Sequence, residues 1–494
     1  MFETVTDKIS AIIRSGAETT MSERDFFETE IALWKKSDAR QMQIKGENYY
    51  QGQHDILDRD RTVIGQDGKL EIVANLPNNK IVDNQYAKMV DQKTNYLFGK
   101  PFTVQSENEQ YEEALKVIFN KRFHRLFSNL GEDSLNGGIG WLYCYYDEEG
   151  AFRFKRFAPY EILPFWKDAE HTALDCAVRV YEVEAYEGRE QKIIEKVEIY
   201  KATGVDRYLL TDDKLVDDVE NPSSDYLFWN DKSGNVRGYN WGRVPIVGFK
   251  YNDEEIPLIR KVKSLQDALN IALSDFQNNM QEDARNTILI IMNYDGENLA
   301  DFRHNLAAYG AVKVKTVDGA PGGVSALQVE VNSENYKVIH EMLKEALIEN
   351  AMGYDAKDDR LAGNPNQMNI QSMYSDIDLD ANGMETEYQA SFEDLLFFIN
   401  AHFANTGVGK FTDEVEVIFN RDMMMNESEI ISNIQKLVGI LSEETLVAQI
   451  PWVNDPQVEL QRLEAEKQKS ADEYADVFPM AGSNRLVTGR PASP

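Results

Sequence analysis

The sequence has 494 residues, of which 42% are hydrophobic and 11% aromatic, so the chain can bury more than one core and is not of the disordered class. With 84 acidic against 52 basic residues its net charge is −32, which argues against a sequence-specific DNA binder and against docking on anionic membranes. No apolar run reaches the length of a membrane span, and residues 1–20 lack the apolar core of a secretory signal.

The amino-terminal half of the chain changes from helical patterns to strand-like runs. Apolar residues at steps of three and four predict helices over residues 22–51, 79–98 and 109–136. Aromatic and β-branched runs then predict an antiparallel meander over 139–211, a polar surface loop over 212–238 and a strand over 244–251. Cys144 and Cys176 lie in apolar strand-like runs, so buried free thiols are favoured over a disulfide.

Two amphipathic helices bracket a small insert that contains strands. The first helix is predicted over residues 258–284, and the second runs from Ser333 to Gly353. The insert is predicted to hold short strands and one short helix, over residues 287–292, 299–308, 311–315 and 326–331. Two such helices do not easily bury their apolar stripes within one monomer, so neighbouring copies would complete the packing.

The carboxy-terminal part of the chain is predicted to be mostly helical. A charged loop over residues 354–365 precedes the longest helical pattern, over residues 366–404. The remaining elements are a strand over 414–419 and helices over 428–441, from Ser442 onward, and over 455–473. We expect residues 476–494 to form a disordered tail.

Motifs for catalysis and metal binding are missing from the sequence. The six histidines are scattered and form neither H-E-x-x-H nor a Cys/His zinc spacing. Neither G-x-x-x-x-G-K-[ST] nor G-x-S-x-G occurs, so the sequence encodes no phosphate-binding loop for ATP hydrolysis and no nucleophile elbow. We therefore expect a protein that is not an enzyme and that needs no cofactor.

One acidic run, with Asp378, Asp380 and Asn382, resembles half of a calcium-binding EF-hand loop. Its twelfth position is Gln389, where a glutamate ligand belongs, and the helical pattern runs through the whole segment. An exposed acidic helix face is the favoured interpretation, and a calcium site is the weaker one. Asp376, Asp378 and Asp380 are also poor candidates for the metal ligands of a nuclease, because residues two apart point to different sides of a helix.

Four stretches of turn and cap residues occur in a characteristic order along the chain. They are Tyr49–Gly52 after a long helix, Asn79–Asp83 leading to Tyr96–Pro101, Phe157–Pro159, and Val415–Pro456. In this order and spacing, over residues 22–470, they resemble the portal proteins of tailed bacteriophages, chiefly the long-tailed phages of Gram-positive hosts.

The resemblance implies an α+β fold, mainly α, with the wing, stem, clip and crown of a portal protein, assembled as a ring of usually twelve copies. Residues 1–257 would form the amino-terminal helices and β wing, 258–284 and 333–353 the stem helices, and 285–332 the clip. Residues 354–365 would form a channel loop, 366–420 a long wing helix and a returning strand, 421–475 a helical crown, and 476–494 the tail.

The resemblance also implies a function and its partners. The ring would be the channel at one capsid vertex through which double-stranded DNA passes, without sequence-specific contact, during packaging and ejection. The implied partners are further copies of the chain, the terminase large subunit, a head–tail connector, and the major capsid and scaffolding proteins, with no membrane. The protein would belong to the virion and would be present in the host cytoplasm during assembly.

Candidate DNA-facing and partner-facing residues follow from this assignment. The channel loop supplies the mixed charges of Asp355, Lys357, Asp358, Asp359 and Arg360. The clip supplies a small basic group, Arg303, Lys313 and Lys315. Mixed charge would touch phosphates weakly, whereas many basic contacts would hold DNA in place. An ordinary solvated surface is the alternative interpretation of both groups.

Two other functions stay open when the residues are taken alone. The first is a metal-dependent nuclease or hydrolase that uses the acidic clusters, although these clusters lack a recognisable ligand spacing. The second is a structural capsid ring without a DNA channel. A strongly acidic surface is compatible with a soluble protein of either kind, and also with a channel that lets DNA slide.

Overall fold

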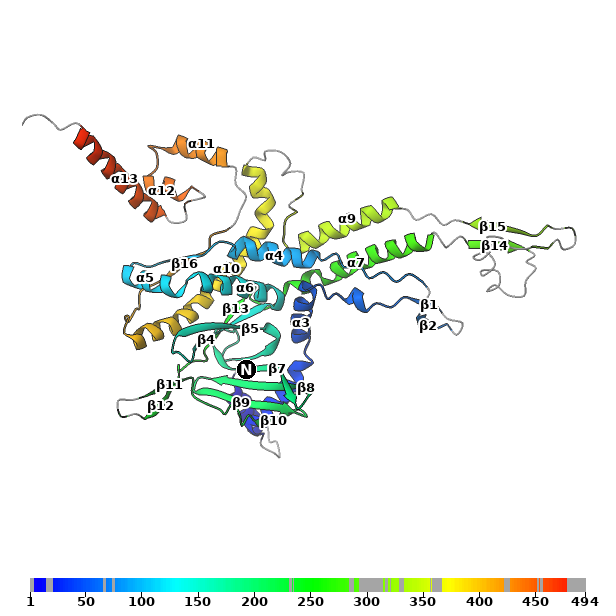
Figure 1. Cartoon of the computed structure of the whole chain (residues 1–494), viewed down its shortest axis with the longest axis horizontal. Helices are drawn as coiled ribbons and strands as arrows, with labels where there is room; N and C mark the ends of the chain where they lie inside the picture. Colours follow the sequence, from blue (N-terminus) through cyan, green and yellow to red (C-terminus); the bar gives the residue numbers. More distant parts are fainter. Residues whose placement is uncertain are drawn as a thin grey trace, which may run out of the picture. The chain divides into compact units, whose positions relative to one another are not determined.

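The structure is a computed structural model that describes residues 4–14, 21–64, 68–72, 76–230, 233, 235–283, 288–292, 314–315, 319, 321–327, 333–355, 357, 367–421, 427–450, 453 and 456–477. The chain divides into two compact units. The first comprises Met1–Asp355 and Asp376–Asp422, and the second comprises Ala356–Ser375 and Met423–Pro494. Figure 1 shows the helices and strands along the chain.

Several helices of the first unit begin where a side chain accepts hydrogen bonds from the first turn. Ser22 and Asp25 form a capping box at α2, and Asn84 accepts a bond from the Ala87 N–H at α4. The helices are α1 (Val5–Arg14), α2 (Glu23–Lys35), α3 (Asp38–Tyr50), α4 (Gln85–Phe98), α5 (Glu109–Ile118), α6 (Lys121–Gly137), α7 (Leu258–Asp283), α9 (Ser333–Asn350) and α10 (Gln367–Thr406). Residues 376–406 of α10 belong to this unit.

The strands of the first unit pair as antiparallel sheets. One sheet has the order β10-β9-β8-β7-β6 and another has the order β13-β4-β5, while β1-β2, β11-β12, β14-β15 and β16-β3 form two-stranded pairs. The larger sheets comprise β4 (Ile139–Tyr146), β5 (Phe152–Phe157), β6 (Ile162–Trp166), β7 (Leu174–Glu187), β8 (Glu190–Lys201), β9 (Gly204–Thr211), β10 (Lys214–Asp217) and β13 (Ile246–Lys250). The pairs comprise β1 (Thr62–Ile64), β2 (Leu70–Ile72), β3 (Thr103–Gln105), β11 (Leu227–Asn230), β12 (Val236–Tyr239), β14 (Ile288–Met292), β15 (Gly323–Leu327) and β16 (Glu416–Ile418).

The five-stranded sheet is covered on both faces. On one face, Phe27 of α2 packs with Phe165 and Val178 in a buried apolar cluster. On the other face, Trp141 of the three-stranded sheet belongs to a cluster with Tyr200. Successive strand residues point to opposite faces, so one strand contributes to both clusters. The two sheets and α2 therefore form a layered core.

A second core joins α10 to the other helices through aromatic side chains. Tyr388 lies 5.1 Å from the ring of Phe98 in α4 and 5.0 Å from that of Phe249 in β13, measured between ring centroids. Phe392 lies 5.2 Å from Phe127 of α6. All five rings are buried. Their burial and ring packing fix this part of α10 against both helices and the three-stranded sheet.

The second unit is helical in its described part. It contains α11 (Glu427–Leu437), α12 (Glu443–Ala448) and α13 (Pro456–Val477). Ser442 caps α12 by accepting a hydrogen bond from the Thr445 N–H, as the sequence predicts. Gln457 of α13 is hydrogen-bonded to Glu444 of α12. Across the described residues of both units, no helix is long and apolar enough to cross a membrane.

Several predicted elements are confirmed. The helices predicted over residues 258–284 and 109–136 are present as α7 and as the pair α5 and α6, and the second amphipathic helix is α9. The predicted antiparallel strands are present as β4 to β9, but they do not form one meander, because β4 and β5 pair with β13 whereas β6 to β9 belong to the five-stranded sheet. Cys144 and Cys176 are buried free thiols, and burial raises the pKa of both.

Three predicted elements are wrong. The single helix predicted over residues 22–51 is broken, because Ser37 caps a new helix by accepting a bond from the Arg40 N–H. The helix predicted from Asn79 begins only at Gln85. The predicted surface loop over residues 212–238 contains β10 and the β11–β12 hairpin. The predicted helix over 299–308, most of the strand over 311–315 and residues 478–494 lie outside the described residues.

Candidate functional site

The helices α7 and α9 lie side by side and antiparallel (Figure 1). Near the end of α7, Asn279 donates a hydrogen bond to the Tyr336 hydroxyl of α9 at 3.0 Å, and Phe276 lies 4.8 Å from the Tyr336 ring. Strands β14 and β15 lie between the two helices in the sequence and pair with Ile288 opposite Leu327. With 26 residues, α7 is about 39 Å long at ~1.5 Å per residue.

This helix pair leaves apolar side chains uncovered. On α9, Val338, Ile339 and Met342 are 46%, 48% and 62% exposed. On α7, Ile271 and Met280 are 39% and 53% exposed. Exposed apolar groups that recur along one pair of helices are typical of a surface that another chain covers.

A row of polar side chains on α7, here called the polar seam, holds the extended segment that precedes α4. The seam side chains recur every four residues and each is buried. Each accepts a backbone N–H: Gln266 from Tyr86 (2.9 Å), Asn270 from Asp83 (3.0 Å), Ser274 from Ile81 (2.9 Å) and Asn278 from Asn79 (2.7 Å). From Asn79 to Asp83 the partners recur every two residues, and two extended residues span about 6.6 Å against about 6 Å for four helical residues, so the two spacings nearly match; the fourth partner, Tyr86, lies in the first turn of α4.

A partly buried charge cluster lies beside the polar seam. The Lys263 ammonium on α7 lies 2.7 Å from carboxylate oxygens of both Asp55 and Asp267. Burial alone would lower the pKa of Lys263, but its bonds to these carboxylates raise it above the usual value. The pKa of Asp55 falls to about 2, because bonds to Lys263 and Lys45 outweigh its burial. The first turns of α7 are therefore tied by charge to the segment after α3.

The end of α9 is anchored to α4 and α10. The Gln92 side chain of α4 bonds to both the carbonyl and the N–H of Tyr354, at 2.9 and 3.0 Å. The buried Lys93 ammonium donates to the Met352 carbonyl at 3.2 Å and forms an ion pair with Asp380 at 2.6 Å. The position where the chain leaves α9 is thus fixed from two sides.

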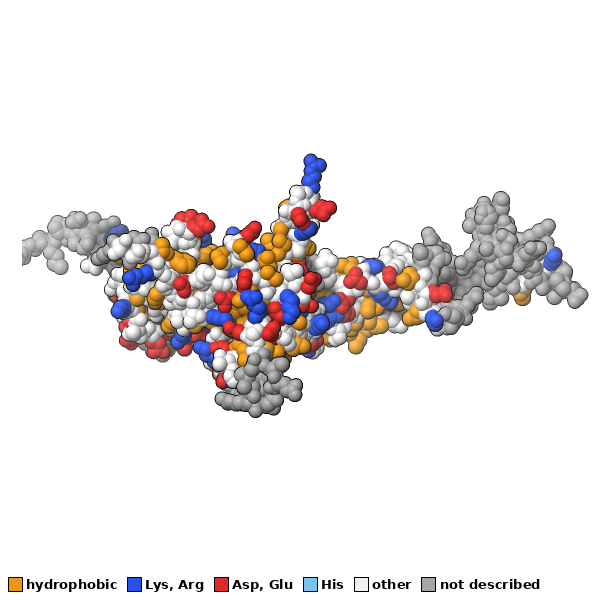
Figure 2. Space-filling model, turned by 90° about the horizontal axis from the view of Figure 1, so that it is seen from below, with side chains coloured by type: hydrophobic (Ala, Val, Ile, Leu, Met, Phe, Trp, Pro, Cys, Tyr) orange, Lys and Arg blue, Asp and Glu red, His pale blue; other side chains and the backbone are white. Residues whose placement is uncertain are grey.

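The predicted channel loop and clip are only partly described. Asp355 is half-buried, and its carboxylate lies 3.7 Å from the Lys344 ammonium of α9, so it belongs to the anchor of α9. Lys357 and Lys315 are exposed. The other candidates, Asp358, Asp359, Arg360, Arg303 and Lys313, lie outside the described residues. Figure 2 shows one face of the molecule, on which acidic and basic side chains are intermixed.

The acidic run on α10 is balanced by protein cations. Asp378 and Asn382 bond to the Arg421 guanidinium at 2.7 and 2.5 Å, whereas Asp380 bonds to Lys93 and to the Tyr251 hydroxyl. The residues of this run therefore do not converge on one point. Among the described residues, no group of three or more His, Cys, Asp or Glu side chains is arranged to hold a metal ion.

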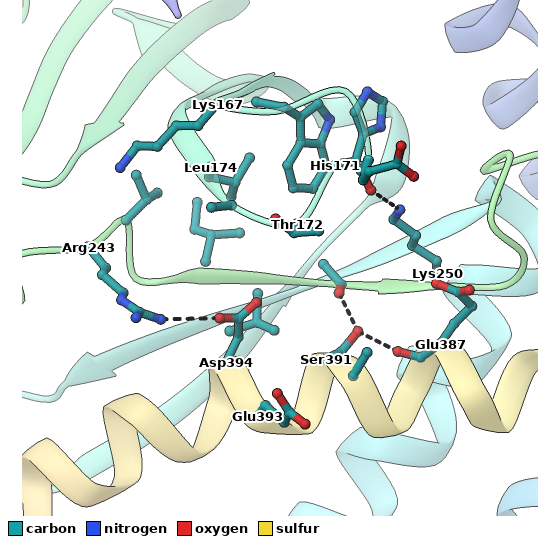
Figure 3. Close-up of a pocket in the computed structure, with 18 of the residues that line it drawn as sticks. Lys167, His171, Thr172, Leu174, Arg243, Lys250, Glu387, Ser391, Glu393 and Asp394 are labelled. Atoms are coloured by element: carbon teal, nitrogen blue, oxygen red, sulfur yellow. Dashed lines mark hydrogen bonds and ion pairs between the residues drawn. The ribbon is translucent and has the colours of Figure 1, made fainter. Parts of the chain in front are cut away.

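A polar cleft of about 700 Å³ lies between β13, α10 and the loop before β7 (Figure 3). Ser391 of α10 donates to the carbonyls of Gly248 and Glu387, at 2.8 and 3.0 Å. His171 is hydrogen-bonded to Glu255 at 2.7 Å. The serine and the histidine thus bond to other groups and not to each other, as a nucleophile and its general base would. Arg243 forms an ion pair with Asp394 of α10 at 3.2 Å, and Lys250 of β13 donates to the Glu170 carbonyl at 3.2 Å, so these groups hold the walls of the cleft together.

Sequence reasoning missed the polar seam and the buried Lys93. The seam left a signal, because four hydrogen-bonding residues recur at steps of four along an amphipathic helix. That pattern identifies a face of α7 but not the segment that it contacts. Lys93 left no local signal, since its buried partner Asp380 is 287 positions away in the sequence.

Comparisons with known proteins match most of the chain. The family model described as "Phage portal protein, SPP1 Gp6-like" matches residues 34–473. A portal protein of Bacillus phage SPP1 is 29% identical over 89% of this chain and 86% of its own length. A portal protein of Clostridium phage phiCD119 is 27% identical over 87% of this chain and 93% of its own length. A chain of the solved "Neck of empty GTA particle computed with C6 symmetry" is 13% identical, covering 74% of this chain and 89% of that chain, with a TM-score of 0.37.

Proposed function

Because this chain belongs to the SPP1 Gp6-like family of phage portal proteins, we propose that it forms a ring of twelve copies at one capsid vertex. Double-stranded DNA passes through the ring during packaging and ejection. The ring docks the terminase large subunit and a head–tail connector, and it sits among the major capsid and scaffolding proteins. The chain acts as a conduit of the virion and not as an enzyme.

The parts of a portal are assigned to the chain as follows. Residues 1–257 and 366–420 form the wing. The helices α7 and α9 form the stem, residues 285–332 the clip, residues 354–365 the channel loop and residues 421–475 the crown. In this assignment the polar seam fixes the first stem helix to the wing, and Lys93 fixes the second at the point where the channel loop begins.

The observation that carries the proposal beyond family membership is the α7–α9 pair. Its two helices are antiparallel, bracket a strand pair and expose Val338, Ile339 and Met342 on α9. In a ring, the neighbouring copy covers such a stripe and completes the packing that the monomer leaves open. Covering apolar surface of this kind contributes about 25 cal/mol per Å² to association.

The charge of the chain fits passage of DNA without retention. Each phosphate contact that a protein makes adds to a salt-dependent affinity, so a strongly basic channel would slow the DNA. This chain has a net charge of −32, and acidic and basic side chains alternate on the surface seen in Figure 2. A channel loop with Lys357 and Arg360 beside acidic residues would make weak, easily broken phosphate contacts.

Deleting residues 357–361 tests the proposed role of the channel loop. The deletion removes Lys357 and Arg360 but retains Asp355, which is paired with Lys344, so rings should still be seen by electron microscopy. Packaging of DNA into capsids should fall, because the loop would no longer touch the passing DNA. Intact rings with unimpaired packaging would overturn this role.

A further inference from the structure

The β11–β12 hairpin carries an unusual share of exposed aromatic side chains. Phe228, Trp229 and Tyr239 are 59%, 56% and 47% exposed, and Val236 is 66% exposed. The hairpin has two strands only, paired with Trp229 opposite Arg237. Large apolar side chains clustered on a small exposed hairpin are typical of a surface that binds a partner.

These aromatic residues border a groove of about 760 Å³, here called the hairpin groove. Its walls are β11 and β12, the turn between β4 and β5, and the carboxy-terminal end of α10. The side chains with rings that line it are Tyr146, Tyr226, Phe228, Trp229 and Tyr239. A hydrogen bond of 2.8 Å between Tyr146 and His402 fixes the wall formed by α10. Five of the eleven described residues that line the groove are therefore aromatic, and its walls are formed by strands, a turn and a helix end.

The charged side chains that line the hairpin groove are acidic. Glu148 and Asp147 of the β4–β5 turn line it, and none of its described lining residues is Lys or Arg. Asp147 forms an ion pair with Arg153 at 2.8 Å, while Glu148 is exposed. Asn405 and Thr406 line the groove, so the carboxy-terminal end of α10 forms part of its wall. A helix carries a partial negative charge at its carboxy-terminal end. Aromatic faces and a negative helix end both attract cations.

We propose that the hairpin groove binds a basic, partly apolar peptide segment of a partner protein. Arginine or lysine side chains of that segment stack on the rings of Trp229 and its neighbours, with Glu148 as a counter-charge. Apolar side chains of the same segment cover Phe228. DNA does not fit this groove, because Glu148 and the helix end repel phosphate. The inference adds a partner of stated chemistry to the proposed function and does not depend on ring formation.

Binding of labelled peptides to the full-length protein tests the proposal. The probe is a short fluorescein-labelled peptide of alternating leucine and arginine, and its affinity is measured by fluorescence anisotropy. The control peptides carry citrulline, which is a neutral isostere of arginine, or glutamate in place of arginine. The basic peptide should bind the wild-type protein, the citrulline peptide about tenfold more weakly, and the glutamate peptide weakest.

Substitutions inside and outside the hairpin groove test whether the peptide binds there. Trp229→Ala should weaken binding of the basic peptide about tenfold, whereas Trp229→Phe should retain most of it because an aromatic face remains. Glu148→Gln should weaken binding roughly two- to fivefold. The controls are Glu149→Gln, which changes the neighbouring exposed carboxylate outside the groove, and Tyr186→Ala, which removes a 70% exposed ring on β7. Both controls should bind as the wild type does.

Several results would overturn the proposal. One is that the wild-type protein binds none of the peptides. Another is that citrulline and arginine peptides bind equally, or that Trp229→Ala binds like the wild type, because attraction to the acidic chain would then explain the signal. A loss of rings in Trp229→Ala, seen by light scattering, would assign the groove to a second copy of the chain instead. Loss of peptide binding with rings intact would support the groove as a partner site.

Discussion

At the scale of single residues, the buried Lys93 connects α4, α9 and α10. Its side chain is 4% exposed, its partner Asp380 is 9% exposed, and the Met352 carbonyl accepts its second bond. Burial lowers the pKa of Lys93, although Asp380 opposes this effect. Without Lys93 the Asp380 carboxylate would keep the Tyr251 hydroxyl and the Lys261 ammonium at 3.8 Å, but it would lose its closest cation, so a buried charge would be less well compensated.

Lys93→Met should therefore lower the free energy of unfolding by about 3 kcal/mol. Urea unfolding followed by tryptophan fluorescence measures this change. Lys192→Met is the control, because Lys192 forms an exposed ion pair with Glu187 on β7 and β8 and should change stability by less than about 1 kcal/mol. Equal losses in the two variants would contradict a special role for the buried pair.

The stability of the folded chain should depend on pH through the Asp133 carboxyl group. Burial raises its pKa to about 7, and its ion pair with Arg156 only partly offsets this. Below pH 4 the group is protonated in both the folded and the unfolded chain. As pH rises from about 4 to about 7 the unfolded chain ionises this group while the folded chain still holds the proton, so stability falls over this range and levels off above pH 7.

Asp133→Asn should remove that dependence. The difference in thermal midpoint between Asp133→Asn and the wild type should shift in favour of the variant between about pH 5 and about pH 8. Differential scanning calorimetry at both pH values measures it. A difference that stays constant, or that shifts in favour of the wild type, would show that the folded carboxyl does not titrate near neutral pH.

At the scale of elements, the polar seam explains why an extended segment precedes α4. The N–H groups of Asn79, Ile81 and Asp83 have no helical partner, and side chains of α7 satisfy them instead. Asn84 then caps α4. Local propensity favours one helix over residues 79–98, but these long-range bonds hold residues 79–83 in an extended conformation.

Ser274→Ala tests the seam against a matched serine on the same helix. Removing the buried Ser274 hydroxyl leaves the Ile81 N–H without its acceptor, which costs about 1–3 kcal/mol locally. Amide hydrogen exchange of the peptide that contains Ile81 should become faster in Ser274→Ala. Ser264 is exposed on α7, and Ser264→Ala should leave this exchange unchanged. Unchanged exchange in Ser274→Ala would mean that the segment does not depend on the seam.

Periodicity in the sequence predicted the long elements well and the breaks poorly. The helix α7 was predicted to within one residue of its end, because its apolar residues repeat over 26 positions. The break at Ser37 was missed, since the apolar pattern continues across it and only the cap chemistry marks it. The β11–β12 hairpin was missed because a polar, turn-rich stretch hides two short strands.

At the scale of the whole molecule, composition and periodicity excluded functions but did not supply one. The resemblance to the family came from the order of four stretches along the chain: Tyr49–Gly52, Asn79–Asp83 leading to Tyr96–Pro101, Phe157–Pro159 and Val415–Pro456. The family model matches residues 34–473. The structure gives a physical reason for one of these stretches, because Asn79–Asp83 is the segment held by the polar seam. The predicted site is less complete, since only Asp355, Lys357 and Lys315 lie in the described part of the chain.

The mass of the purified particle tests whether the chain forms a ring. The single chain has a mass of 56.5 kDa. Light scattering across a range of salt concentrations, with negative-stain images of the same samples, should show rings with a mass that is a multiple of this value, twelvefold for the proposed ring. A stable monomer of 56.5 kDa, with no rings at any salt concentration, would contradict the assignment as a portal channel.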